Sequence, residues 1–222
     1  GARLEQRVRP QQVAAVGGLA MLLAFVVGTQ IGIAAALKQN TRVDYSVMGV
    51  AMLGISIPNF VVAPLLILGL AVYAGWLPAG GWDWSWQRMI LPVITLALPV
   101  VAYIARLMRG SMIEVLHSDY VRTARAKGLS EPKVLFSHVL RNALIPILTS
   151  AGSYLPFVFL GSLVFESFFG IPGLGAYVIE AITGQDFAIV RSMVFIGSVI
   201  YILSYIVIDV AYTWADPRVR LA

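Results

Sequence analysis

The stretch that decides the fold is polar and basic, and it reads Asp119-Tyr-Val-Arg-Thr-Ala-Arg-Ala-Lys-Gly128-Leu-Ser-Glu-Pro-Lys-Val-Leu-Phe-Ser-His-Val-Leu-Arg-Asn-Ala-Leu-Ile-Pro146. It is the centre of a wider island, residues 106–141, which holds seven of the sixteen Lys and Arg residues in the chain. The sequence on either side of the island is almost free of charge. This pattern indicates a membrane protein whose largest water-exposed feature is the island.

The composition supports a membrane location for the rest of the chain. Hydrophobic residues make up 59% of the sequence and charged residues only 12%, whereas about a quarter of the residues in soluble domains are charged. Five charge-free intervals are long enough for a spanning helix, which needs roughly 17 to 25 residues. Their residues do not alternate between apolar and polar, as barrel strands do. The sequence therefore predicts five membrane helices, at about Val13–Leu37, Val47–Val72, Met89–Leu107, Ala143–Val164 and Ile189–Tyr212.

The basic residues predict an orientation. If the sides alternate with each span, the 38–46 linker, the island and the C-terminus share one side with eleven Lys and Arg residues, against Arg88 and Arg191 on the other. The positive-inside rule makes the richer side cytoplasmic. This also explains the net charge of +5, so we expect no nucleic-acid partner. The basic N-terminal segment disagrees, and we interpret it as a sign that a leading span is missing or processed.

Within the island, the sequence predicts two short helices joined by a tight bend. Helical spacing over 113–126 would align Ile113, Leu116, Tyr120 and Ala124 on one face. Gly128 would end the first helix. The second would begin with Ser130 as N-cap, followed by Glu131 and Pro132. Composition alone gives about equal weight to a solvated basic loop near anionic lipid.

The island resembles a known family. Its Ala-x-x-x-Gly pattern, within Asp119–Gly128 and with His138 and Arg141-Asn-Ala-Leu-Ile-Pro146, is similar to the EAA loop of binding-protein-dependent ABC importer permeases, in the dipeptide/oligopeptide/nickel branch. Supporting motifs occur in the same order as in that family, at Ile57-Pro-Asn-Phe60, Leu77-Pro-Ala-Gly-Gly81, Glu166-Ser-Phe-Phe-Gly-Ile-Pro-Gly-Leu-Gly175 and Asp209–Arg220. The resemblance covers roughly residues 13–222. Arg122 and Arg141 depart from the general loop, and the first span usual in the family is absent.

The resemblance implies an all-α, polytopic membrane helix bundle like the type I ABC importer permeases. Residues 1–222 would form a single transmembrane permease domain, with a cytoplasmic coupling loop at 106–141. The chain would be a transport subunit of the bacterial inner membrane rather than an enzyme. It would move short peptides, or alternatively nickel chelates or another small solute. We expect as partners a second homologous permease, two cytoplasmic ATPase subunits, an extracytoplasmic substrate-binding protein and the lipid bilayer.

The resemblance also assigns roles to residues. ATP and Mg²⁺ would be bound by the ATPase subunits, with no cofactor on this chain, which has no Gly-Lys-Ser/Thr motif. The bend around Gly128 would fit a groove of the ATPase. The residues expected to couple the two subunits are Tyr120, Arg122, Ala124, Arg125, Lys127, Gly128, Leu129, Ser130 and Glu131.

The remaining candidates lie near helix ends. Pathway or gate roles are expected for Pro58, Asn59, Glu166, Phe168 and Phe169. For Glu166, gating and a structural cap on nearby backbone donors have equal weight, since an acid in a membrane segment is costly. Structural roles are expected for Asp209, Asp216 and Arg218, with Asp209 pairing with Arg106 or Arg109.

Two other functions remain as alternatives. An intramembrane enzyme would need a convergent set of catalytic residues within the spans, and both histidines, His117 and His138, lie outside them, where we expect no metal site. An assembly or regulatory membrane protein without transport is the third possibility.

Overall fold

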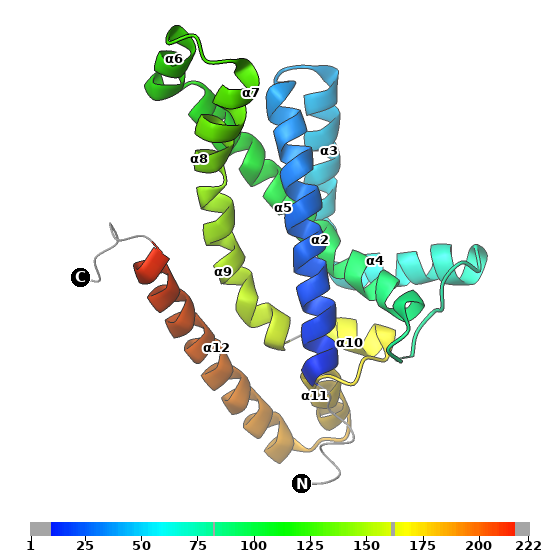
Figure 1. Cartoon of the computed structure of the whole chain (residues 1–222). Coiled ribbons are helices and arrows are strands. Elements are labelled where there is room, and N and C mark those ends of the chain that lie inside the picture. The colour runs from blue at the N-terminus through cyan, green and yellow to red at the C-terminus, as the bar shows by residue number, and fades with distance from the viewer. Residues whose placement is uncertain (1–9, 82, 161–162, 216–222) are drawn as a thin grey trace. The chain divides into compact units, whose positions relative to one another are not determined.

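The computed structural model describes residues 10–81, 83–160 and 163–215, and within these ranges it contains helices and no strand (Figure 1). The prediction of an all-α, polytopic helix bundle is confirmed. The helices, two of them in the wider π form, are α2 (Pro10–Leu37), α3 (Arg42–Ser56), α4 (Asn59–Leu66), η1 (Ile67–Tyr73), α5 (Trp86–Leu116), α6 (Asp119–Ala126), α7 (Glu131–Lys133), η2 (Val134–Leu140), α8 (Arg141–Ala143), α9 (Ile145–Leu160), α10 (Leu163–Phe169), α11 (Leu174–Thr183) and α12 (Phe187–Ala215).

Three predicted spans coincide with single long helices. Among the described residues, α2, α5 and α12 each contain a segment long and apolar enough to cross a membrane. Both α5 and α12 extend beyond the predicted bounds, and α5 continues to Leu116 through Arg106 and Arg109. A charge-free gap marks the apolar centre of a helix and not its ends, because a helix that leaves the membrane can continue through charged residues in water.

The predicted span at Val47–Val72 is two helices. The segment α3 ends at Ser56, and Ile57 and Pro58 have extended backbones before α4 begins at Asn59. Pro58 has no backbone N–H to continue the α3 ladder, and its ring disfavours helical geometry at Ile57. Pro64, by contrast, lies inside α4. Taken together as one bent segment, the helices on the two sides of this break are still long and apolar enough to cross a membrane, so the single-span prediction stays a prediction.

The helical segment that contains the start of the predicted span at Ala143–Val164 begins upstream of Ala143. A candidate span runs over Glu131–Ala151, through α7, η2 and α8 into α9. The polar residues His138 and Arg141 thus lie in helices, in η2 and α8 respectively, and not in a loop.

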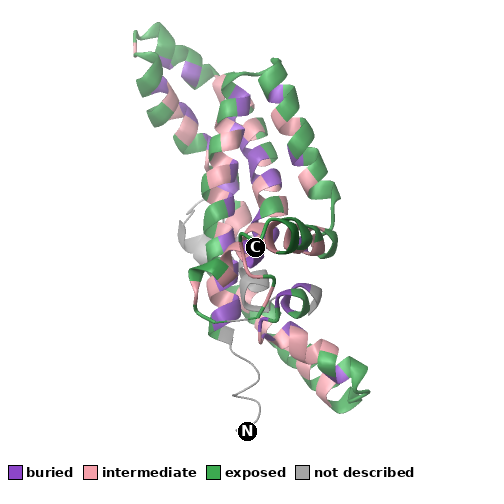
Figure 2. Ribbon diagram, turned by 90° about the vertical axis from the view of Figure 1, so that its right-hand side faces the viewer, coloured by how far each residue is buried: buried purple, intermediate pink, exposed green. Residues whose placement is uncertain are grey.

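The chain divides into two compact units, which are described separately. One unit comprises Met21–Ile57 and Ala97–Ala151. Its apolar core joins α2 and α5 to the helices that follow Asp119, through buried residues that include Ala36, Met108, Met112, Val121, Val134 and Ala143. Figure 2 shows that buried and exposed residues lie on different faces of the same helices.

Small residues on α2 allow α5 to approach closely in this unit. Ala24, Gly28, Gly32 and Ala36 recur at every fourth position, and both alanines are buried. A Cβ placed on Gly32 would lie 2.6 Å from the carbonyl oxygen of Ala105 and 2.6 Å from the Cβ of Met108. The backbones therefore pack closely, as in the small-xxx-small contacts of membrane helices.

The other unit comprises the described residues of 1–20, 58–96 and 152–222. Its core is smaller, and α10 packs against both α4 and α11. The buried residues that form this core are Val13, Val16, Ala63, Leu91, Phe165, Phe169 and Ile171.

Candidate coupling hairpin and buried turn

The predicted hairpin is present, but its first helix differs from the prediction. The helix α5 ends at Leu116, and α6 begins afresh at Asp119 after Ser118, whose backbone is extended. This break shifts the register, so α6 buries Val121 and Ala124, whereas Tyr120 is 45% exposed. The predicted common face of Ile113, Leu116, Tyr120 and Ala124 is therefore wrong at Tyr120.

The bend between α6 and α7 follows from the hydrogen bonds that end α6. The Gly128 N–H donates to the Arg125 carbonyl at 2.9 Å, and the Leu129 N–H donates to the Ala124 carbonyl at 3.4 Å. These two bonds form a Schellman motif, whose C′ residue needs a positive φ. Gly128 has φ +77°, a conformation that glycine adopts without steric cost. Leu129 is half-buried and packs against the core.

An ion pair closes the hairpin across the bend. The Arg125 guanidinium donates to the two carboxylate oxygens of Glu131, at 2.8 and 3.4 Å. Both side chains are exposed, by 41% and 68%. The backbone of Ser130 occupies the predicted N-cap position of α7, but its side chain makes no capping hydrogen bond.

The hairpin therefore presents most of the predicted coupling residues to solvent. Ala124 is buried and Leu129 is half-buried. The others are exposed, namely Tyr120, Arg122, Arg125, Lys127, Gly128, Ser130 and Glu131. A compact basic hairpin of this kind is suited to contact another protein through polar and close backbone interactions.

A second ion pair in the same unit has a buried carboxylate and a guanidinium that is 26% exposed. The Arg109 guanidinium on α5 donates to both carboxylate oxygens of Asp44 in the first turn of α3, at 2.5 and 2.6 Å. Asp44 is 1% exposed and also accepts the backbone N–H of Asn40. Sequence analysis missed this pair because 65 residues separate its partners.

The predicted pairing of Asp209 with Arg106 or Arg109 stays a prediction. The structure describes the backbone of Asp209 within α12 but not its side chain, and Asp216 and Arg218 lie outside the described residues.

In the other unit, Glu166 caps a helix. Its carboxylate accepts the backbone N–H of Ala176, in the first turn of α11, at 3.0 Å, and the side chain is 1% exposed. A carboxylate is favourable at a helix N-terminus because the free N–H groups and the helix dipole point toward it. The capping role expected for Glu166 is thus present, while a gating role stays a prediction.

The remaining gate candidates belong to the same unit. Phe169 is buried and its ring lies 5.0 Å from that of Phe165, whereas Phe168 is 42% exposed. Pro58 is the N-cap residue of α4. Asn59, the first residue of α4, buries its side-chain carbonyl oxygen without a hydrogen-bond partner among the described residues.

The loop before α5 packs onto the turn after α10. A Cβ on Gly80 would lie within 4 Å of the carbonyl oxygens of Phe168 and Phe169. Arg88 fixes the loop by donating to the Gly80 carbonyl at 2.9 Å and by pairing with Asp83 at 3.2 Å. Hydrogen bonds from Ser85, together with the charge of Arg88, lower the pKa of Asp83. Two of the family-like motifs therefore meet in space.

Comparison with solved structures identifies the fold. The fold is similar to that of an amino acid ABC transporter crystallised with histidines, with a TM-score of 0.69 over 93% of this chain and 91% of that one. It is also similar to the MetNI methionine ABC transporter in inward-facing conformations, with a TM-score of 0.66 over 90% and 93%. Both are 16% identical to this chain. The likeness therefore shows the fold alone, which this chain shares with chains of ABC transporters.

The chain belongs to the family described as "Binding-protein-dependent transport system inner membrane component", whose model matches residues 28–221. It is 46% identical to the oligopeptide transport system permease protein OppB of Salmonella typhimurium, over 93% of this chain and 68% of that protein. It is 44% identical to the dipeptide transport system permease protein DppB of Bacillus subtilis, over 93% and 67%. The family resemblance drawn from the sequence motifs is confirmed.

Proposed function

We propose that this chain is a permease subunit of an ABC importer that carries short peptides across the bacterial inner membrane. The proposal is supported by the family match and by the names of the relatives, which are oligopeptide and dipeptide permeases. The single structural observation that carries it is the compact hairpin of α6 and α7, closed by a Schellman motif and an ion pair. The chain contributes membrane helices and binds no nucleotide.

The hairpin docks, in this proposal, on a cytoplasmic ATPase subunit. Two such ATPases bind ATP and Mg²⁺, and a second homologous permease completes the path. The exposed side chains of Arg122, Arg125 and Lys127 contact the ATPase, and Gly128 lets its backbone approach closely. The core beneath Val121 and Ala124 joins the hairpin to α2 and α5. Movement of the ATPases is thereby transmitted to the membrane helices.

The substrate path involves the residues near Pro58, Asn59, Glu166, Phe168 and Phe169. An extracytoplasmic binding protein delivers the peptide to the opposite side from the hairpin. The island 106–141 and the C-terminus lie in the cytoplasm, as the distribution of Lys and Arg predicts. Residues 1–222 act as one transmembrane domain.

The first test of the proposal is peptide uptake. Cells that lack the gene should lose uptake of a radiolabelled tripeptide, and the gene should restore it. Loss of uptake of a nickel chelate, with peptide uptake intact, would contradict the peptide assignment and favour the alternative substrate.

Substitutions at Gly128 test the coupling role. A Cβ on Gly128 would meet no atom within 4 Å, so the cost within this chain comes from the positive φ. Asn tolerates that conformation and Val does not. We expect Gly128→Val to reduce ATPase co-purification and uptake at least tenfold and Gly128→Asn to retain more of both. Gly128→Asp should also lose the ATPase if the groove excludes a charge. Normal co-purification and uptake in all three variants, with normal membrane insertion, would contradict the proposal.

A further inference from the structure

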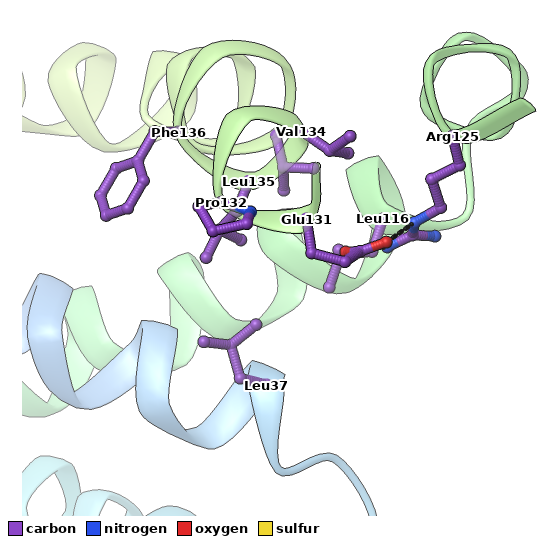
Figure 3. A pocket seen from close by; sticks show the side chains of 9 residues that line it. Leu37, Leu116, Arg125, Glu131, Pro132, Val134, Leu135 and Phe136 are labelled. Atoms are coloured by element: carbon purple, nitrogen blue, oxygen red, sulfur yellow. Dashed lines mark hydrogen bonds and ion pairs between the residues drawn. The ribbon is translucent and has the colours of Figure 1, made fainter. Parts of the chain in front are cut away.

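An open cavity of about 350 Å³ lies beside the hairpin, among α6, α7, η2 and the ends of α2 and α5 (Figure 3). Its volume falls within the range of roughly 300 to 1,000 Å³ that is typical of small-molecule sites. Apart from Leu37, the described lining residues belong to the island 106–141, which the proposed function places in the cytoplasm. The cavity is therefore a candidate site for a solute of the cytoplasm.

The lining of the cavity is mostly apolar. Val134 and Val139 are fully buried, whereas Leu37 is 52% exposed. Phe136 is 66% exposed. Burial of exposed apolar surface is the main source of affinity for apolar ligands, so the occupant should carry apolar side chains. The apolar members of the lining are Leu37, Leu116, Pro132, Val134, Leu135, Phe136 and Val139.

One side of the cavity carries a positive and a negative group. Figure 3 shows Arg125 and Glu131 on this side and Phe136 on the other. The ion pair uses two of the five guanidinium N–H donors, at Nε and Nη2. The remaining donors can hold a carboxylate, and the remaining lone pairs of Glu131 can accept hydrogen bonds from an ammonium group. The charges on this side therefore match an occupant that carries both a carboxylate and an ammonium group.

We propose that this cavity binds a short peptide with apolar side chains and free termini. The inference rests on the proposed function, which delivers such peptides to the cytoplasm. The carboxylate of the peptide lies at Arg125 and its ammonium group at Glu131, and its side chains cover the exposed surface of Phe136. Arg125 and Glu131 also belong to the residues expected to contact the ATPase. Accumulated product would therefore compete with coupling and slow further uptake.

Photolabelling tests whether a peptide occupies the cavity. The full chain, assembled with its partner subunits in nanodiscs, would be exposed to the dipeptide Leu-Leu with a diazirine on one side chain. Mass spectrometry would then locate the label. We expect label in residues 131–139 that unlabelled Leu-Leu displaces. Gly-Gly has both charges but no side chains to bury, so it should displace the label about tenfold less well.

Modified peptides test the charge match. Acetylation of the N-terminus removes the ammonium group, and amidation of the C-terminus removes the carboxylate. Because the protein's charges are exposed, each change should lower labelling of the parent protein about threefold. In Glu131→Gln, acetylation should have no further effect, because the opposite charge is already absent. In Arg125→Gln, amidation should likewise have none.

Phe136→Ser tests the apolar part of the site. It removes an exposed side chain of the lining, and we expect labelling by Leu-Leu to fall about tenfold. Leu148→Ser is a matched control, because Leu148 is also 66% exposed, belongs to the same unit and is not among the described lining residues. Equal losses in the two variants would show that the label reports apolar surface in general and would overturn the proposal.

Other outcomes would also overturn it. Equal displacement by Gly-Gly and Leu-Leu would show that the apolar lining makes no contribution. An effect of acetylation that persists in Glu131→Gln would separate the ammonium group from this carboxylate. Label that appears only when the ATPase subunits are omitted would make the ATPase the occupant. Absence of label from 131–139, in a protein that still supports uptake of Leu-Leu by cells, would exclude the site and leave the proposed function intact.

Discussion

The hairpin and the α3–α5 contact both depend on an arginine–carboxylate pair, but water reaches the two pairs very differently. In the hairpin, Arg125 and Glu131 are both largely exposed. Between α3 and α5, Asp44 is 1% exposed and Arg109 donates to both of its oxygens. Exposed pairs contribute little because water screens them, whereas a buried charge that loses its partner is strongly destabilising. The same chemistry therefore gives an adaptable surface in one region and a fixed contact in the other.

The largest effect is expected when the buried pair is broken. Arg109→Ala leaves the Asp44 carboxylate buried without its guanidinium, and we expect the free energy of unfolding to fall by about 3 to 5 kcal/mol. Denaturant unfolding in detergent would measure it. Arg109→Lys keeps the charge but loses the bidentate contact, so it should lower the free energy of unfolding by less than Arg109→Ala does. Arg106→Ala is the control, since Arg106 is exposed. Equal losses for Arg109→Ala and Arg106→Ala would remove the distinction between the two regions.

A smaller loss is expected from crowding the contact between α2 and α5. In Gly32→Ala the new methyl group would meet the Ala105 carbonyl and Met108 at 2.6 Å, so the helices must separate. Overpacking of this kind costs about 1 to 3 kcal/mol. Gly18→Ala, on the same helix, meets no atom within 4 Å and serves as the control. If both variants unfold at the same denaturant concentration as the parent protein, α2 and α5 do not pack as described.

A second buried carboxylate extends the comparison to the other unit. In Gly173→Ala the new methyl group would collide with the Glu166 carboxylate and displace it from the Ala176 N–H. Loss of a helix cap costs about 0.5 to 2 kcal/mol. Hydrogen exchange should increase at the first turn of α11 and not at α6. Unchanged exchange at α11 would contradict the capping role.

The smallest effect on stability is expected at the exposed pair. Glu131→Gln removes one charge of the hairpin contact, and we expect a loss below about 1 kcal/mol in the free energy of unfolding. Thermal unfolding at low and high salt would measure it, with the difference from the parent protein smaller at high salt. A loss as large as that of Arg109→Ala would show that the hairpin is held as rigidly as the α3–α5 contact.

Local features of the sequence predicted much of the fold and the existence of the hairpin. Gly128 permits a positive φ and Pro132 fixes its own φ, and both effects are local, so the bend could be located without a structure. The register of α6 could not be predicted from the sequence. The break at His117 and Ser118 places Val121 on the buried face of α6, where the prediction had placed Tyr120. The stripe of Ala24, Gly28, Gly32 and Ala36 has a four-residue spacing that is itself a signal for close helix packing.

The sequence by itself determined the apolar helices, the basic hairpin and the family, since hydrophobicity, glycine and proline act locally and the motifs are contiguous. Only the tertiary structure decided which charges are buried and which partners they have. Asp44 and Arg109 are 65 residues apart, and Glu166 reaches Ala176 across a turn. The energy of a carboxylate depends on its surroundings after folding, and the chain order does not contain that information.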